Sequence, residues 1–181
     1  MASRWQDNSQ RYGCISKALH WGMAILLIWQ LAIMVYKVSL DLTPADSALV
    51  RTHTAVGFLL FLLIVLRLIW ALINRNSRPA HANSATGMLA KWGHRLLYLL
   101  MLLIPSLGLL RAYGSGRGFA PFGIRIMEQT GVKTEWMMAP ANAVHGLLGW
   151  VLLAVIVGHI VMALVHHFVM RDDTLQRMTK G

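Results

Sequence analysis

The chain has 181 residues, of which 56% are hydrophobic and only 13% charged, with a mean hydropathy of +0.54. This composition excludes an ordinary soluble domain and predicts one compact membrane domain over residues 1–181. The only cysteine, Cys14, excludes disulfides, CxxC zinc sites, iron–sulfur clusters and covalent CxxCH haem attachment within the chain. The net charge of +10 comes from residues between apolar segments, which favours a topology signal over nucleic-acid binding.

Four apolar segments are long enough to cross a bilayer, since about 20 helical residues suffice. The expected spans are about 17–38, 52–73, 91–111 and 141–169. They predict an all-α integral membrane protein, a four-helix bundle in the lipid bilayer. No cleavable signal peptide is expected, because the first residues are polar and the first apolar segment can be retained as a span.

The polar segments between the spans are predicted to be loops. Residues 1–16 are expected to form a frayed or interfacial arm, and 39–50 and 74–90 to form connections. The longest connection, 112–140, is rich in glycine, and a short charged tail follows the fourth span. Four spans place both termini on one side of the membrane.

The distribution of basic residues predicts which side that is. Ten lie on the side of the termini: Arg4, Arg11, Lys17, Arg75, Arg78, Lys91, Arg95, Arg171, Arg177 and Lys180. Six lie on the other side: Lys37, Arg51, Arg111, Arg117, Arg125 and Lys133. Basic residues accumulate on the cytoplasmic side, so both termini are predicted to be cytoplasmic in a multi-pass protein of the bacterial inner membrane.

The fourth span carries histidines on one face. His145 and His159 are fourteen residues apart, which returns the helix to within roughly 40° of the same direction after a rise of roughly 21 Å. His166 and His167 follow about two turns later, on or near that face. Imidazoles are costly in lipid, so their presence indicates a function.

This topology predicts how deep in the membrane each histidine lies. His20 begins an outward-going helix and His53 begins an inward-going helix, so depth pairs His20 with His159 and His53 with His145. Two facing imidazoles suit the axial positions of a b-type haem, so we predict two haem b groups, one near each membrane face. A zinc site or a proton pathway is the alternative, although no Asp or Glu lies within the expected spans.

The motif set resembles the bacterial cytochrome b561 family over nearly the whole chain. The residues that carry the resemblance are His20, Trp21, His53, Gly57, Arg67, His94, Tyr98, Pro105, Gly108, His145, His159, His166 and His167. The resemblance implies a four-helix di-haem protein of the inner membrane that exchanges electrons with ubiquinone, and it implies the same haem pairings. It also implies, for the best understood kind of member, a superoxide oxidase that takes electrons from superoxide at the periplasmic face.

Other polar residues are candidates for cofactor contacts. Arg67 lies fourteen residues after His53 and is expected either to pair with a propionate of the inner haem or to snorkel to the cytoplasmic surface. Arg51, Arg95 and Arg111 at helix ends are weaker propionate candidates. Gly57 and Gly149, each four residues after a histidine, are expected to give the macrocycle room or simply to pack against another helix.

His166 is a candidate ubiquinone contact, because it lies beyond the inner haem and an imidazole can pass protons to a quinone as it is reduced. The end of a helix also favours a charged imidazole without any ligand. His94 has no expected partner at its depth and is predicted to be interfacial or to bond a propionate.

Two main functions follow. One is a superoxide:ubiquinone oxidoreductase with a small-molecule or protein electron donor on the periplasmic side. The other is a passive electron-relay cytochrome b subunit of a larger dehydrogenase or hydrogenase complex. A histidine-lined metal carrier without redox activity is a third possibility.

Overall fold

The computed structural model describes residues 4–43, 46–79 and 84–179, so Lys180 of the topology prediction lies outside the described residues. Its main elements are four long helices: α1 (Cys14–Ser39), α2 (Ala48–Ile73), α3 (Ala85–Gly114) and α4 (Glu135–Val165). Each is long and apolar enough to cross a membrane. The predicted all-α membrane fold is therefore confirmed.

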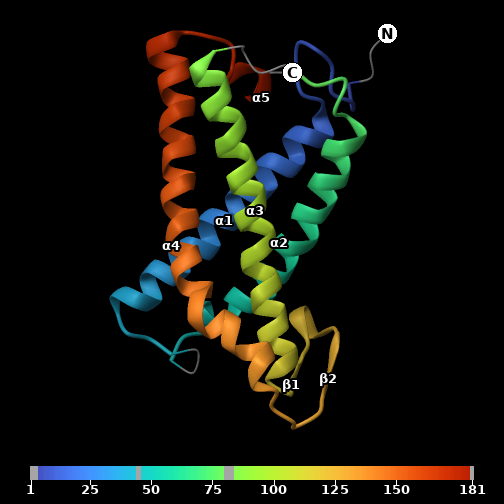
Figure 1. The fold of residues 1–181 in the computed structure, drawn as a ribbon, viewed down its shortest axis with the longest axis vertical. Coiled ribbons are helices and arrows are strands. Elements are labelled where there is room, and N and C mark those ends of the chain that lie inside the picture. Colours follow the sequence, from blue (N-terminus) through green and yellow to red (C-terminus); the bar gives the residue numbers. More distant parts are fainter. Residues whose placement is uncertain (1–3, 44–45, 80–83, 180–181) are drawn as a thin grey trace.

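The bundle is closed at one end by the arm before α1 and by the short C-terminal helix α5 (Gln176–Thr179) (Figure 1). The Tyr12 N–H donates to the Arg177 carbonyl at 3.4 Å, so the two terminal segments touch. We call this the inner end, because the topology prediction places it in the cytoplasm. The opposite, outer end carries a small hairpin.

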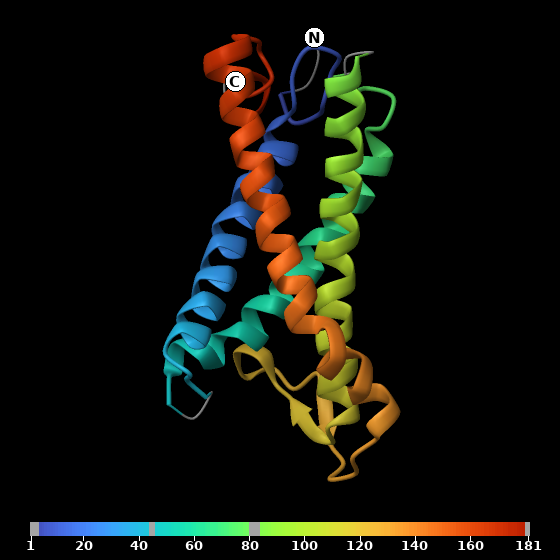
Figure 2. The ribbon, with the colours of Figure 1, turned by 60° about the vertical axis from the view of Figure 1, so that its left-hand side comes forward.

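Neighbouring helices in the sequence pack against each other, α1 against α2, α2 against α3, and α3 most extensively against α4. Figures 1 and 2 show α1 and α2 inclined to the more upright α3 and α4. Among the described residues, α4 makes few or no close backbone contacts with α1 or α2. Side chains must therefore bridge those two helix pairs.

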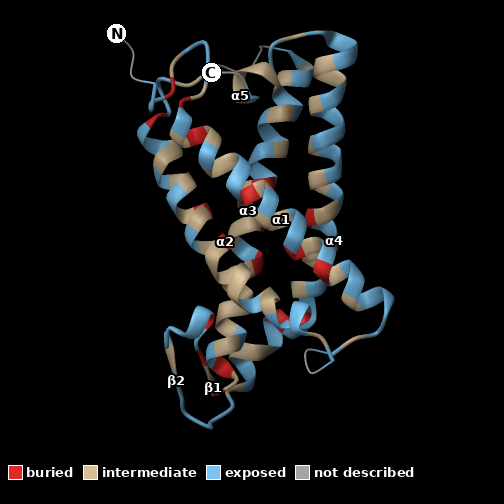
Figure 3. Ribbon diagram, turned by 180° about the vertical axis from the view of Figure 1, so that it is seen from behind, coloured by how far each residue is buried: buried red, intermediate tan, exposed pale blue. Residues whose placement is uncertain are grey.

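The apolar core forms a layer halfway along the bundle. One cluster joins α3 and α4 and the other joins α1 and α2, with Leu27 and Met101 packed against both. Their buried members are Leu97, Leu100, Ile104 and Leu152 in the first, and Met23, Leu60 and Ile64 in the second. Figure 3 shows that few positions of the helices are buried in the chain alone and that the others are intermediate or exposed, as lipid-facing helices require.

The third and fourth helices are longer than the sequence predicted. α3 begins at Ala85 because the Ser84 hydroxyl caps it by accepting the Gly87 N–H at 3.2 Å. α4 begins at Glu135 and includes Pro140, and Figure 1 shows the outer part of this helix bending. The predicted connections 74–90 and 112–140 are correspondingly shorter.

The connection between α3 and α4 is not an open loop but a β-hairpin. Strands β1 (Arg117–Phe119) and β2 (Met127–Gln129) pair antiparallel, with Phe119 opposite Met127. Gly116 takes a positive φ of 65°, and a Cβ there would lie 2.4 Å from the Val132 carbonyl oxygen. The Phe119 ring is buried 5.6 Å from that of Phe58, which fixes the hairpin against α2.

Candidate functional site

The inner end holds the first predicted histidine pair. His20 of α1 and His159 of α4 face each other with ring centres 6.3 Å apart and ring planes at 64°. Within the described residues, α1 and α4 make few or no close backbone contacts, and the two rings meet across the gap between these helices. The structure thus brings His20 and His159 together as the sequence predicted.

The second predicted pair lies toward the outer end. His53 of α2 and His145 of α4 have ring centres 6.1 Å apart and ring planes at 74°. In the described part of the chain, the buried His53 Nδ1 has no hydrogen-bond partner. A core histidine that serves only packing normally has its ring nitrogens satisfied, so an ordinary structural role does not explain His53.

Two neighbours shape the outer pair. Gly108 of α3 lies against His145, because a Cβ there would be 3.3 Å from His145 Cε1. Gly57 packs against Gln30 of α1, because a Cβ at residue 57 would lie 3.1 Å from Gln30 Nε2. The same Gln30 Nε2 donates a hydrogen bond to the His53 carbonyl at 2.8 Å. Gly149 has no atom within 4 Å of its Cβ position, so the space beside it is open in the chain alone.

A third histidine lies at the inner level, and the prediction that His94 has no partner at its depth is wrong. Its ring centre is 5.2 Å from that of His159, and its Nδ1 lies 2.8 Å from the Ala90 carbonyl oxygen. The reason is the early start of α3, which carries His94 beyond the first two turns of the helix. The cap at Ser84 is the sequence signal that could have revealed it.

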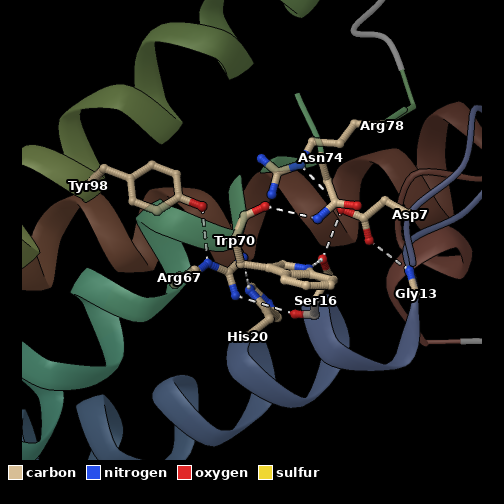
Figure 4. A network of polar contacts seen from close by, with 9 residues as sticks. All are labelled: Asp7, Gly13, Ser16, His20, Arg67, Trp70, Asn74, Arg78 and Tyr98. Carbon is tan, nitrogen blue, oxygen red and sulfur yellow. Dashed lines mark hydrogen bonds and ion pairs between the residues drawn. The ribbon is translucent and has the colours of Figure 1, made fainter. Parts of the chain in front are cut away.

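Arg67 points into the bundle and does not snorkel to the surface (Figure 4). Its Nε donates to the Tyr98 hydroxyl at 3.1 Å, one terminal nitrogen donates to the Ser16 carbonyl at 3.5 Å, and the other lies 3.3 Å from His20 Nδ1. An arginine can only donate, so His20 Nδ1 accepts in this arrangement and His20 Nε2 carries the ring proton. Arg67 is therefore at the depth expected for a contact with an inner cofactor.

A buried carboxylate, which the sequence did not indicate, anchors the arm before α1 (Figure 4). The Asp7 side chain is fully buried and accepts hydrogen bonds from the Gly13 N–H at 2.8 Å and the Ser16 hydroxyl at 2.9 Å. It also pairs with Arg78 Nε at 3.3 Å. The arm was predicted to be frayed or interfacial; its described part is instead folded, because Asp7 finds a cation and two donors in the interior.

A cavity of about 320 Å³ opens beside the outer pair. Its lining includes His53 and three cations, Lys37 of α1, Arg51 of α2 and Arg111 of α3. Arg111 also donates to the Asn142 side chain at 2.7 Å, which holds it against α4. Three converging positive charges next to a histidine make this cavity suitable for an anion.

His166 lies beyond the inner pair, at the start of the π-helical turn His166–Met170. It is seven residues, or roughly 10 Å along the helix, past His159. Its Nδ1 is 2.6 Å from Asp172 Oδ2. Arg95, one of the weaker propionate candidates, stacks on the Trp92 ring at 4.7 Å, while the neighbour of His166, His167, contacts the Phe168 ring.

Four membrane-crossing helices that present two facing histidine pairs at different depths define a membrane electron-transfer protein of the cytochrome b class. The family model described as prokaryotic cytochrome b561 matches residues 11–181, and this chain belongs to that family. It is a multi-pass bacterial membrane protein, and its family binds haem b.

Two relatives span nearly the same length. "Cytochrome b561 homolog 2" of Escherichia coli (strain K12) is 33% identical over 174 residues, which cover 95% of this chain and 93% of that protein. "Probable superoxide oxidase CybB" of Yersinia pestis is 28% identical over 179 residues, which cover 93% of this chain and 96% of that protein.

The residues present fit haem b. Two imidazoles bound to opposite sides of one metal, with bonds of about 2 Å, have ring centres roughly 6 Å apart, as both histidine pairs do. An imidazole that binds iron through Nε2 carries its proton on Nδ1, so Arg67 could no longer donate to His20 and would be free to donate to a propionate. The unpartnered His53 Nδ1 is also consistent with a site built for a further group.

Proposed function

We propose that the chain is a di-haem b-type cytochrome that transfers electrons across the membrane from superoxide at the periplasmic face to ubiquinone. The observation that carries the proposal is the presence of two histidine pairs, His53 with His145 and His20 with His159, each spaced for one metal ion. The chain would hold one haem per pair through these four axial ligands. Each haem, when bound, supplies a reversible one-electron iron couple.

The outer cavity supports superoxide as the donor. Lys37, Arg51 and Arg111 would draw a small anion toward His53, and Arg51 and Arg111 remain candidates for propionate contacts at the same level. Superoxide gives up one electron and leaves as neutral O₂, which the positive cavity would not retain. The name of the Yersinia pestis relative is consistent with this donor.

The inner end supports ubiquinone as the acceptor. His166 is largely buried but keeps some exposure, and it lies between the inner pair and the tail, where a quinone from the bilayer can reach a hydrogen-bonding imidazole. Arg67 would hold the inner haem through a propionate. Both roles are part of the proposal.

The test is to purify the protein, measure the number of haems per polypeptide, and then measure ubiquinol formation with superoxide and ubiquinone as substrates. We expect two haems and superoxide-dependent ubiquinol formation without any other protein. One haem per chain, or quinone reduction that proceeds equally without superoxide, contradicts the proposal.

A second candidate is an electron-relay subunit of a larger dehydrogenase or hydrogenase complex. The outer hairpin region favours it, because the side chains of Phe122, Ile124 and Trp136 are exposed by 64%, 65% and 68% and could contact a protein partner. In that case the haems would be reduced only when a soluble partner is added, and superoxide alone would give no turnover.

A further inference from the structure

A carboxylate turns back onto His166 at the inner end of α4. Asp172 Oδ2 lies 2.6 Å from His166 Nδ1, and the two side chains are 39% and 16% exposed. The chain reverses here because the π-helical turn His166–Met170 is followed by Arg171 in the left-handed conformation, with φ 54°. The Asp172 N–H then donates to the His166 carbonyl at 3.1 Å, so backbone and side chain hold the same two residues together.

The carboxylate is fixed and charged. Asp172 Oδ1 accepts the Thr174 N–H at 2.9 Å, which leaves Oδ2 for His166. Burial alone would raise the pKa of Asp172, but the hydrogen bonds from His166 and Thr174 lower that pKa to about 2. A carboxylate only accepts hydrogen bonds, so His166 Nδ1 carries a proton and His166 Nε2 is the nitrogen left for another partner.

The surroundings suit an apolar substrate from the bilayer. His166 lies two turns from His159, on nearly the same face of the helix. Phe168 and Val169, two and three residues after His166, are 68% and 73% exposed. The tail is held against α1, where Trp21 Nε1 donates to the Met178 carbonyl at 3.1 Å. A quinone with an isoprenoid chain could lie along this apolar surface with its ring at His166.

We propose that His166 and Asp172 form a proton-donating dyad for quinone reduction, in which Asp172 is the positioning residue. This rests on the proposed function. Two superoxide ions, each oxidised to O₂, supply two electrons, and two protons from the inner aqueous side complete the conversion of quinone to quinol. At each proton transfer a His166 Nε2–H bond breaks and an O–H bond forms on the quinone. The imidazolium thereby becomes neutral imidazole, and His166 then regains a proton from water. Asp172 stabilises the imidazolium and fixes its orientation.

A purely structural alternative is that Asp172 only terminates α4 through its bond to Thr174. The two roles differ in kinetics. A positioning role predicts that Asp172→Asn lowers kcat for ubiquinone by about 10- to 100-fold, changes KM little and increases the solvent deuterium isotope effect. Haem content, haem spectra and reduction of the haems by superoxide should be unchanged, and Asp172→Glu should restore part of the rate.

The control is Asp173→Asn, which removes the neighbouring exposed carboxylate and should change none of these quantities. His166→Gln should reproduce the loss, and the double variant should be no slower than either single variant, since the two residues act as one unit. An unchanged kcat in Asp172→Asn, or losses that multiply in the double variant, overturns the dyad. If the wild-type protein itself fails to reduce ubiquinone, the proposed function is overturned and the dyad with it.

Discussion

At the inner level His20 is surrounded by protein groups, with Arg67 at 3.3 Å, the Trp21 ring at 5.2 Å and His159 across the helix gap. At the outer level His53 has an unpartnered Nδ1 in the described structure and lines a cavity with three cations. Two histidine pairs with almost the same ring spacing therefore sit in opposite surroundings. The ring spacing is thus common to the two levels, whereas the groups around the rings differ.

The difference has a functional meaning. An outer level that opens onto a positive cavity is suited to a small diffusing anion, since a charged substrate needs an aqueous route. At the inner level, Asp7 pairs with Arg78 and the tail is hydrogen-bonded to α1, so under the proposed function an apolar acceptor would approach from the lipid-facing end of α4. Variants that lose one histidine level and keep the other test this difference most directly.

The largest expected effect is the loss of one haem. We expect His145→Ala to abolish haem at the outer level and His159→Ala to abolish it at the inner level, each leaving about one haem per chain. The measurement is haem content with reduced-minus-oxidised spectra. His53→Ala should give the same spectrum as His145→Ala, and His20→Ala the same as His159→Ala; a variant that keeps both haems contradicts its assignment.

The second effect is on stability at the inner end. Asp7→Ala leaves Arg78 and two donors without their buried acceptor, so we expect a loss of about 3 kcal/mol in the free energy of unfolding in detergent. The matched control is Glu128→Ala at the outer end, which breaks the exposed ion pair with Arg125 and should cost at most about 1 kcal/mol. Equal losses in the two variants would show that Asp7 is not a buried anchor.

These two ends also differ in what the sequence revealed. Hydropathy located all four spans, and the fourteen-residue spacing of His145 and His159 predicted two levels on α4. Asp7 was missed because its cation is 71 residues away, and a lone carboxylate in a polar arm gives no local pattern. The basic cavity was not predicted as a site, because its charges come from three different helices and meet only in the folded chain.

The remaining differences between the predicted and the observed structure arise at the ends of the helices and in the connection between α3 and α4. The spans were delimited by the long apolar segments, so the first turns of α3 and α4, which precede Lys91 and Ala141, were assigned to loops. For α3 this displaced His94 from the level where it meets His159. The hairpin was missed because three-residue strands in a glycine-rich segment give too short a pattern for the alternation of a strand.

The third effect concerns packing at the outer pair. Gly108→Ala should gain about 0.5–1 kcal/mol from helix propensity, but its Cβ would lie 3.3 Å from His145 Cε1 and push the ring. We expect an altered outer-haem spectrum and a several-fold weaker retention of that haem. Gly93→Ala on the same helix meets no atom within 4 Å and should leave both haems unchanged, so equal spectra in the two variants would contradict this prediction.

The fourth effect is on the rate of electron entry. Arg111→Gln removes one of the three cavity cations, so we expect about a 2- to 5-fold slower reaction with superoxide at low ionic strength and a weaker dependence on salt. Arg125→Gln on the exposed hairpin is the charge-matched control, measured by the same stopped-flow haem reduction. If both variants slow the reaction equally, net charge and not the cavity attracts the donor.

The smallest effect is the acid sensitivity of two carboxylates, Asp172 in the tail at the inner end and Asp46 at the outer end. The pKa of Asp172 is lowered from 3.8 to about 2, so the stability that its bonds to His166 and Thr174 contribute is complete above the unfolded pKa. It is lost as the pH falls from about 4 through 2. At the outer end, hydrogen bonds from the Thr43 hydroxyl and N–H also lower the pKa of Asp46, although that side chain is fully exposed.

Amide hydrogen exchange at Thr174 and Thr43 measures the acid sensitivity at the two ends. Each amide should lose protection in acid, and Asp172→Asn should remove the acid transition at Thr174 alone. A Thr174 transition that survives this substitution would assign the tail's acid sensitivity to a different group.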